Sequence, residues 1–114
     1  MSEPIIHITS RTSWSAAQSS GQYSADSLQI EGFIHCSKRD QVLRVANAFY
    51  GNKTDLVLLV IDGMRLNPEL HWEPGSDKPD ELFPHVYGPI NLDAVLRVLD
   101  FPPGADGKWN SLPL

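Results

Sequence analysis

The sequence contains one cysteine and no apolar stretch long enough to cross a bilayer. Cys36 cannot form a disulfide within the chain, so the fold must rest on its hydrophobic core. The longest apolar run, residues 56–61, is far shorter than the roughly 20 residues of a transmembrane helix. Residues 1–4 also lack the basic start and apolar segment of a signal peptide. These absences predict a cytoplasmic protein without a membrane partner.

Clusters of basic residues are also missing. Nine Lys and Arg residues stand against 14 Asp and Glu residues, the formal net charge is −5, and the basic residues never cluster beyond Lys38-Arg39. Proteins that bind DNA or long RNA usually carry a basic stripe. Long nucleic acid is therefore not the expected ligand. A small anion remains compatible with the charge, because local backbone amides can hold one.

The sequence shows no metal-ligand spacing motif. His71-x-Glu73 together with His35 or His85 could supply enough ligands, so metal-dependent hydrolysis stays open as an alternative, but we expect no metal cofactor. The apolar fraction of 41% and the charged fraction of 20% are ordinary for a globular protein. At this length a second hydrophobic core would leave each half too small, which predicts a single domain over residues 1–114.

Two helices are indicated by capping residues and apolar spacing. The shorter, N-terminal one covers about 13–20, with Thr12 or Ser13 as its cap and Gly21 at its end. The main helix covers about 38–50, where Ser37-x-x-Asp40 resembles a capping box and apolar residues follow at helical spacing.

Short β-branched and apolar segments between turn residues predict the strands. We expect them at residues 5–9, 32–36, 56–62, 70–73, 83–87 and 95–101. The segment 56–62 is apolar on both faces, as in a central strand. The order of elements shows no βαβ rhythm, which favours an α+β fold with mixed or antiparallel sheets.

Four of these strands carry polar or ionisable side chains among apolar ones. They are His7; His35 with Ser37; His71 with Glu73; and His85 with Tyr87. Burying such groups costs free energy unless they are hydrogen-bonded, so the chain either pairs them or uses them. We therefore look for a functional site where these segments meet, although any one of these residues alone could have a structural role.

Each residue type suggests a role. His35 and Ser37 stand at the start of the main helix, where free amides favour an anion such as phosphate. Glu73 could hold a ribose or stabilise an oxocarbenium-like centre. Prolines and a glycine restrict the backbone around His85 and Tyr87, which helps to aim both at one place. Trp14 could supply an aromatic wall.

Cys36 does not act with its neighbour His35 in this reading, because adjacent residues of a strand point to opposite faces. His7 could contact a ligand hydroxyl or lie exposed on an edge strand.

Taken together, the motifs resemble the family DUF952 of bacteria and plants, over nearly the whole chain. The most specific blocks are Glu31-Gly32-Phe33-Ile34-His35-Cys36-Ser37 and Phe83-Pro84-His85-Val86-Tyr87-Gly88-Pro89. The family looks distantly related to the ADP-ribosyltransferase fold, in which two small sheets split to hold nicotinamide adenine dinucleotide (NAD). By motif position, His7 resembles the first contact of that fold, the segment 35–37 the second, and Glu73 the acidic residue that holds the ribose.

The resemblance implies binding of NAD, ADP-ribose or a related phosphorylated ribose, by an ADP-ribosyl or 2′-phosphate transferase. The expected catalytic residues are Glu73, His35 and His85. The expected cofactor-binding residues are His7, Ser37, Tyr87 and Trp14. A non-catalytic module that binds a small ligand or a protein through the same cleft is the main alternative.

Overall fold

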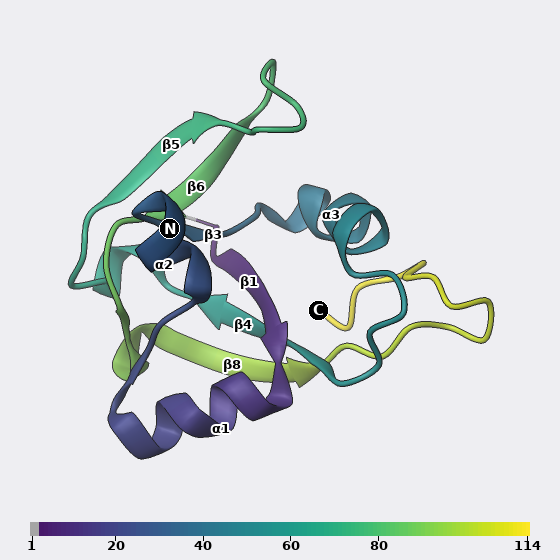
Figure 1. Cartoon of the computed structure of the whole chain (residues 1–114), viewed down its shortest axis with the longest axis horizontal. Coiled ribbons are helices and arrows are strands. Elements are labelled where there is room, and N and C mark those ends of the chain that lie inside the picture. Colours follow the sequence, from purple (N-terminus) through teal and green to yellow (C-terminus); the bar gives the residue numbers. More distant parts are fainter. Residues whose placement is uncertain (1–2) are drawn as a thin grey trace.

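The computed structural model describes residues 3–114, so Met1 and Ser2 of the predicted domain lie outside the described residues. The chain folds into an α+β structure of small antiparallel sheets and few helices (Figure 1). This confirms the predicted fold class. Within residues 3–114 no helix is long and apolar enough to cross a membrane.

The first sheet has the strand order β1-β4-β8, with both pairings antiparallel. Its strands are β1 (Ile5–Ser10), β4 (Leu56–Ile61) and β8 (Val95–Asp100). All six residues of β4 are buried. A strand that is apolar on both faces needs cover on both sides, so the predicted central strand is confirmed.

The second sheet has the order β3-β6-β5, also antiparallel. Its strands are β3 (Ile34–His35), β6 (Leu82–Val86) and β5 (Leu70–Pro74). A two-stranded pair, β2 (Gln22–Tyr23) with β7 (Ile90–Asn91), completes the strands. A single antiparallel bridge between Ile6 and Ser37 joins the first sheet to the second.

The first helix, α1 (Arg11–Ser20), begins two residues earlier than predicted. Its cap is Ser10, whose hydroxyl accepts a hydrogen bond from the Ser13 amide, rather than Thr12 or Ser13. Gly21 ends the helix with φ 94°, a left-handed conformation that favours glycine. The short helix α2 (Asp26–Glu31) follows and ends at Gly32, whose φ is 90°. Because Gly32 takes this helix-ending conformation, β3 is shorter than the predicted strand 32–36.

The main helix consists of a 3-10 turn, η1 (Arg39–Gln41), followed by α3 (Val42–Phe49). Its predicted capping box is wrong. The Ser37 backbone is bonded to Ile6 in the inter-sheet bridge, which holds Ser37 in the strand register. The turn begins one residue later, where the Gln41 side chain accepts a hydrogen bond from the Lys38 amide at 2.8 Å. Two more 3-10 turns are η2 (Gly63–Arg65) and η3 (Leu92–Ala94).

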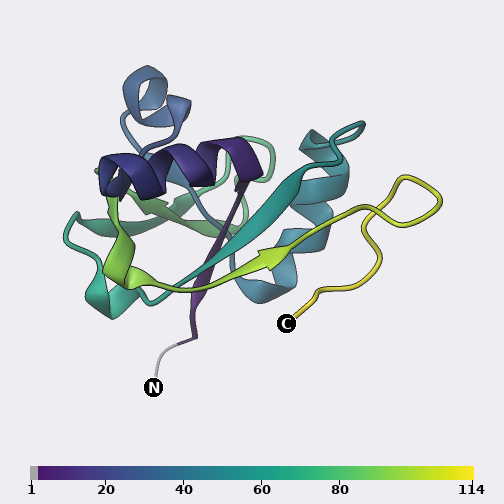
Figure 2. The same cartoon turned by 90° about the horizontal axis from the view of Figure 1, so that it is seen from below.

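Two hydrophobic cores lie on opposite faces of the first sheet, so the single core expected from the length is wrong. The two cores share one sheet and do not divide the chain into halves. Alternate residues of β4 belong to different cores, Leu59 to the first and Leu58 to the second. The first core contains Ala17 of α1 and the inner face of the second sheet, whereas the second contains Ala46 of α3. Figure 2 shows α1 and α3 separated by the first sheet. The tail after β8 returns to the second core and buries Trp109, so it packs on the body as part of the fold.

Candidate functional site

The ionisable residues of the second sheet share its outer face. His35 of β3 lies opposite His85 of β6, and His85 lies opposite His71 of β5. Side chains in register on adjacent antiparallel strands point to the same side, so the three imidazoles form a row across the sheet. Neighbouring residues at a period of two, such as Ser37 and Glu73, join that face. The alternation of side chains along each strand, together with the pairing of β3, β6 and β5, therefore places residues from distant parts of the sequence on one face.

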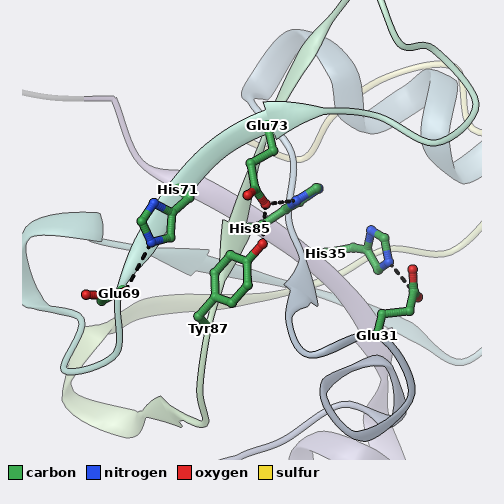
Figure 3. A network of polar contacts seen from close by, with 7 residues as sticks. All are labelled: Glu31, His35, Glu69, His71, Glu73, His85 and Tyr87. Atoms are coloured by element: carbon green, nitrogen blue, oxygen red, sulfur yellow. Dashed lines mark hydrogen bonds and ion pairs between the residues drawn. The ribbon is translucent and has the colours of Figure 1, made fainter.

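His85 is the buried member of the row, with 4% of its surface exposed. Its Nδ1 donates to Glu73 Oε1 at 2.7 Å, and the Tyr87 hydroxyl donates to the same oxygen at 2.5 Å (Figure 3). The bond from Tyr87, and after it the bond from His85, lowers the pKa of the Glu73 carboxyl below its ordinary value. The same bond raises the pKa of Tyr87. Glu73 is thus an ionised acceptor that fixes the orientation of His85.

The second nitrogen of His85 is left free by this arrangement. Phe33 stacks on the imidazole, with ring centroids 4.1 Å apart and an interplanar angle of 15°. In residues 3–114, no fully buried side-chain nitrogen or oxygen lacks a hydrogen-bond partner. Since Nδ1 makes the one hydrogen bond of this ring, Nε2 must reach accessible space. His85 is among the residues that line the cavity described next.

This cavity, which we call the α3 cavity, lies between α3 and the outer face of the second sheet. It has a volume of about 250 Å³. The residues that line it are Ile6, Ile8, Glu31, His35, Cys36, Ser37, Val45, Phe49, Tyr50, Gly75, Ser76, Asp77, Phe83 and His85. The carboxylates Glu31 and Asp77 are part of this lining, and within the described chain no Lys or Arg is. The cavity therefore favours a neutral or positively charged guest.

His35 lies at the edge of the α3 cavity, half exposed. Its Nε2 lies 2.9 Å from Glu31 Oε2, in an ion pair with α2 that forms when His35 is protonated. His71 makes a similar contact with Glu69 at 3.1 Å on the far strand, outside the cavity lining (Figure 3). Each of the three histidines in the row therefore contacts one acidic residue. Of the three, only His85 is buried, so only Glu73 orients a buried imidazole.

A second cavity, the hydroxyl cavity, lies on the other side of His35 and has a volume of about 600 Å³. Its lining is rich in hydroxyl groups and consists of His7, Ile8, Thr9, Ser10, Thr12, Ser13, Tyr23, Ser24, Ala25, Asp26, Ser27, His35, Tyr50, Lys53, Asp55 and Leu56. The two cavities share three residues: Ile8, His35 and Tyr50.

His7 lines the hydroxyl cavity with both ring nitrogens engaged. Nδ1 lies 2.6 Å from the His35 carbonyl oxygen, and Nε2 lies 2.7 Å from the Tyr23 hydroxyl. Burial lowers the pKa of His7 to about 4, so the ring is neutral and has one N–H. A carbonyl oxygen accepts only, which places that hydrogen on Nδ1 and makes Nε2 the acceptor from Tyr23. His7 therefore has no free nitrogen for a ligand.

The structure brings some of the predicted site residues together and separates others. His35, Ser37 and His85 line the α3 cavity, and Glu73 and Tyr87 reach it through His85. His7 lines the hydroxyl cavity, whereas Trp14 packs against the first core and lines neither cavity. Cys36 belongs to the first core, and burial raises the pKa of its thiol.

Sequence reasoning missed three contributors to the site. Phe33 stacks on His85, Glu31 pairs with His35, and Tyr50 lines both cavities. The period of two that links Phe33 with His35 was a usable signal for the first. Nothing local indicates Tyr50, because it enters the site from the end of another element.

Of the predicted anion site at the start of the main helix, His35 and Ser37 line the α3 cavity, whereas among the described residues none of the first turn, Arg39–Gln41, does. The lining includes Val45, Phe49 and Tyr50 from the second half of that helix and its end, where the backbone dipole is negative. Among residues 3–114, no three His, Cys, Asp or Glu residues are grouped so that they could hold a metal ion. The metal-dependent alternative therefore gains no ligand set.

Comparisons with known proteins agree with this fold. A crystal structure of protein CC0527 from Caulobacter crescentus has a TM-score of 0.84 and 31% identity, covering 94% of this chain and 93% of that one. Its solution NMR structure has a TM-score of 0.81 and 31% identity, covering 94% and 91%. A search of the curated proteins found no match. Residues 8–98 match the family described as "Protein of unknown function (DUF952)". The chain therefore belongs to the DUF952 family, as its motifs predicted.

Proposed function

We propose that the α3 cavity binds a small polar organic molecule and that His85 Nε2 exchanges a proton with it. The observation that carries this proposal is the Glu73–His85 pair, in which a carboxylate holds one nitrogen of a buried imidazole that lines a cavity and leaves its other nitrogen without a hydrogen bond to the described residues. This is the arrangement by which an acidic residue orients a general acid or base. Glu73 acts here as a positioning residue, because it does not itself line the cavity.

The size and charge of the cavity narrow the ligand. Ligand pockets for drug-sized molecules occupy roughly 300–1,000 Å³, so about 250 Å³ suits a sugar or a nucleoside fragment. A phosphate group would face the carboxylates Glu31 and Asp77, and among the described residues no Lys or Arg lines the cavity to pair with it. NAD and ADP-ribose remain within the proposal if their ribosyl part enters and their phosphates stay outside. The likeness to ADP-ribosyltransferases is likewise a proposal and rests on the motifs.

Titration with ligands of graded charge tests this proposal. We would add ribose, adenosine, ADP-ribose and NAD to the purified protein and follow heat of binding together with the ring ¹⁵N signals of the histidines. The expected result is saturable binding of a neutral ribosyl compound that shifts the His85 signal. His85→Gln should weaken the binding that the heat measures, because it removes the ring that lines the cavity. His71→Gln, on the same sheet face but outside the cavity, is the matched control and should bind normally. Loss of binding in both variants, or none in the parent protein at millimolar ligand, would contradict the proposal.

Glu73→Gln separates catalysis from simple binding. Gln keeps the size of the side chain but removes the charge that orients His85. If His85 transfers a proton in a reaction, conversion of the ligand should fall about 10²–10⁴-fold while affinity changes little. A non-catalytic binding module would show the same affinity in both proteins and no conversion in either.

A further inference from the structure

The two cavities meet at a gap between β1 and β3. These strands are joined by the antiparallel bridge between Ile6 and Ser37. If the pairing continued, the next residues to face each other would be Ile8 and His35. Instead, the His35 carbonyl accepts a hydrogen bond from His7 Nδ1 at 2.6 Å. The ladder between the two sheets therefore stops after one bridge.

The backbone of Ile8 faces this gap. In an antiparallel pair, alternate residues direct their N–H and C=O groups to the same neighbour. Ile6 directs both groups to Ser37, and the Arg11 amide donates to the Asp55 carbonyl on the opposite side. Even-numbered residues of β1 therefore point away from β4. Within the described chain, Ile8 has no backbone hydrogen bond on its outward side.

The edge of β3 follows the same rule. The Cys36 amide donates to the Pro84 carbonyl of β6, so the adjacent residue, His35, directs its backbone away from β6 and toward β1. The residues shared by the two cavities include both Ile8 and His35. The gap in the ladder therefore lies where the linings of the two cavities overlap, and the outward N–H and C=O of Ile8 stand at that gap.

We propose that this gap binds a ligand unit that resembles one peptide residue, whose N–H and C=O belong to successive groups of its backbone and pair with Ile8 as a residue of an added strand would. The ligand carbonyl accepts from the Ile8 N–H, and the ligand N–H donates to the Ile8 carbonyl. In strand addition, backbone bonds supply affinity and flanking pockets select side chains. The α3 cavity favours positive charge, since its lining contains Asp77, Glu31, which also contacts His35, and the aromatic ring of Phe49. The ligand class is therefore a cationic amide.

This inference rests on the same α3 cavity as the proposed function and assigns it a cationic guest in place of a neutral ribosyl compound, both of which the charge of the lining admits. It does not depend on proton transfer by His85. The amide could come from a peptide or from a small molecule, and the two sources are separable by experiment. We would use N-acetyl-lysine N-methylamide as the peptide probe and glycinamide as the small-molecule probe. The readout is the backbone amide signal of Ile8 in ¹H–¹⁵N spectra.

The lysine probe should shift the Ile8 and His35 amide signals saturably. Two altered probes should bind about tenfold more weakly: the matching glutamate compound, and a lysine compound whose backbone nitrogens are methylated and cannot donate. Shifts of Ile8 with glycinamide equal to those with the lysine probe would assign the small-molecule source. Shifts with the lysine probe alone would assign the peptide source.

Ile8→Pro removes the N–H that faces the gap and leaves every hydrogen bond to β4 intact. It should therefore weaken binding of the lysine probe about tenfold. Ile8→Val keeps the N–H and is the control. If Ile8→Pro does not fold, the methylated probe decides. Equal binding of the methylated and unmethylated probes, or no Ile8 shift at millimolar probe, would overturn the inference. A lysine probe that shifts Ile8 in the parent protein and leaves the His85 ring signal unmoved would count against proton exchange alone. A ligand that shifts the His85 ring and leaves Ile8 unmoved would count against the amide site alone.

Discussion

At the scale of single residues, the two buried histidines do different work. His85 lines a cavity and uses one ring nitrogen in a hydrogen bond, whereas both ring nitrogens of His7 are hydrogen-bonded to protein groups. Burial raises the pKa of Tyr23 to about 12, and its hydroxyl contacts both His7 Nε2 at 2.7 Å and Thr9 Oγ1 at 2.9 Å. This series of hydrogen bonds fixes the neutral imidazole of His7 between the first sheet and β3. We therefore assign His7 a structural role in the inter-sheet gap.

The neutral state of His7 predicts a loss of stability in mild acid. Its pKa is about 4 in the folded protein, against an ordinary value of 6.5. Between these values the unfolded state binds more protons, so the free energy of unfolding falls as the pH falls. The loss between pH 7.5 and pH 5 should be about 2 kcal/mol, because each pKa unit corresponds to about 1.4 kcal/mol. Urea unfolding at the two pH values measures it.

His7→Gln is the matched variant for this prediction. Its amide can donate to the His35 carbonyl and accept from Tyr23, but it does not titrate. The variant should lose about 2 kcal/mol less than the parent protein over the same pH interval. An equal loss in both proteins would assign the acid sensitivity to other groups.

At the scale of elements, the C-terminal tail is held to α3 by one side chain. Asn47 Nδ2 donates to the Trp109 carbonyl, and the Trp109 amide donates to Asn47 Oδ1, both at 2.9 Å. The indole N–H of Trp109 donates to the Phe101 carbonyl at 3.0 Å, and the two rings stack. The tail thus closes the second core through a pair of bonds that resembles one rung of a sheet.

Asn47→Ala should loosen the tail and lower stability by about 1–3 kcal/mol, because it leaves the Trp109 backbone groups unpaired. Lys108 precedes Trp109 on an exposed segment, so trypsin should cleave there faster in the variant, as the tail opens more often. Asn110→Ala is the control: its side chain bonds to Asp106 in the tail itself and not to α3. Equal cleavage rates in the two variants would show that Asn47 does not hold the tail.

The elements also show what the sequence could predict. Apolar character on both faces located β4, and helical spacing located α3, since both signals are carried by residues that are neighbours in the chain. The cap at Ser37 was predicted wrongly because Ser37 bonds to Ile6, a contact between segments far apart in sequence. The period of two placed His35, Ser37 and Phe33 on one face. It could not separate His7 from the α3 cavity, because that depends on where the sheets split.

At the scale of the whole molecule, the first sheet is the common wall of both cores. Leu58 and Leu59 are adjacent in β4, fully buried, and belong to different cores. Neither core can lose this strand without exposing the other. The candidate site depends on the same wall, since Ile6 and Ile8 of β1 line the α3 cavity and belong to the second core. The cavity should therefore persist only while both cores are intact.

The shared wall predicts that both cores unfold in one transition. Trp14 packs against the first core, Trp109 is buried in the second, and Trp72 is exposed, so the three tryptophans can be separated as probes. Trp72→Phe with Trp109→Phe leaves a probe of the first core, and Trp72→Phe with Trp14→Phe leaves a probe of the second. In each variant the fluorescence midpoint in urea should coincide with the midpoint from far-ultraviolet circular dichroism.

In Asn47→Ala, by contrast, the Trp109 fluorescence should change at a lower urea concentration than the circular dichroism does, because the tail leaves the second core while the sheet stays folded. A Trp109 transition that precedes the dichroism without the Asn47 change would mean that the two cores are independent units and that β4 does not couple them.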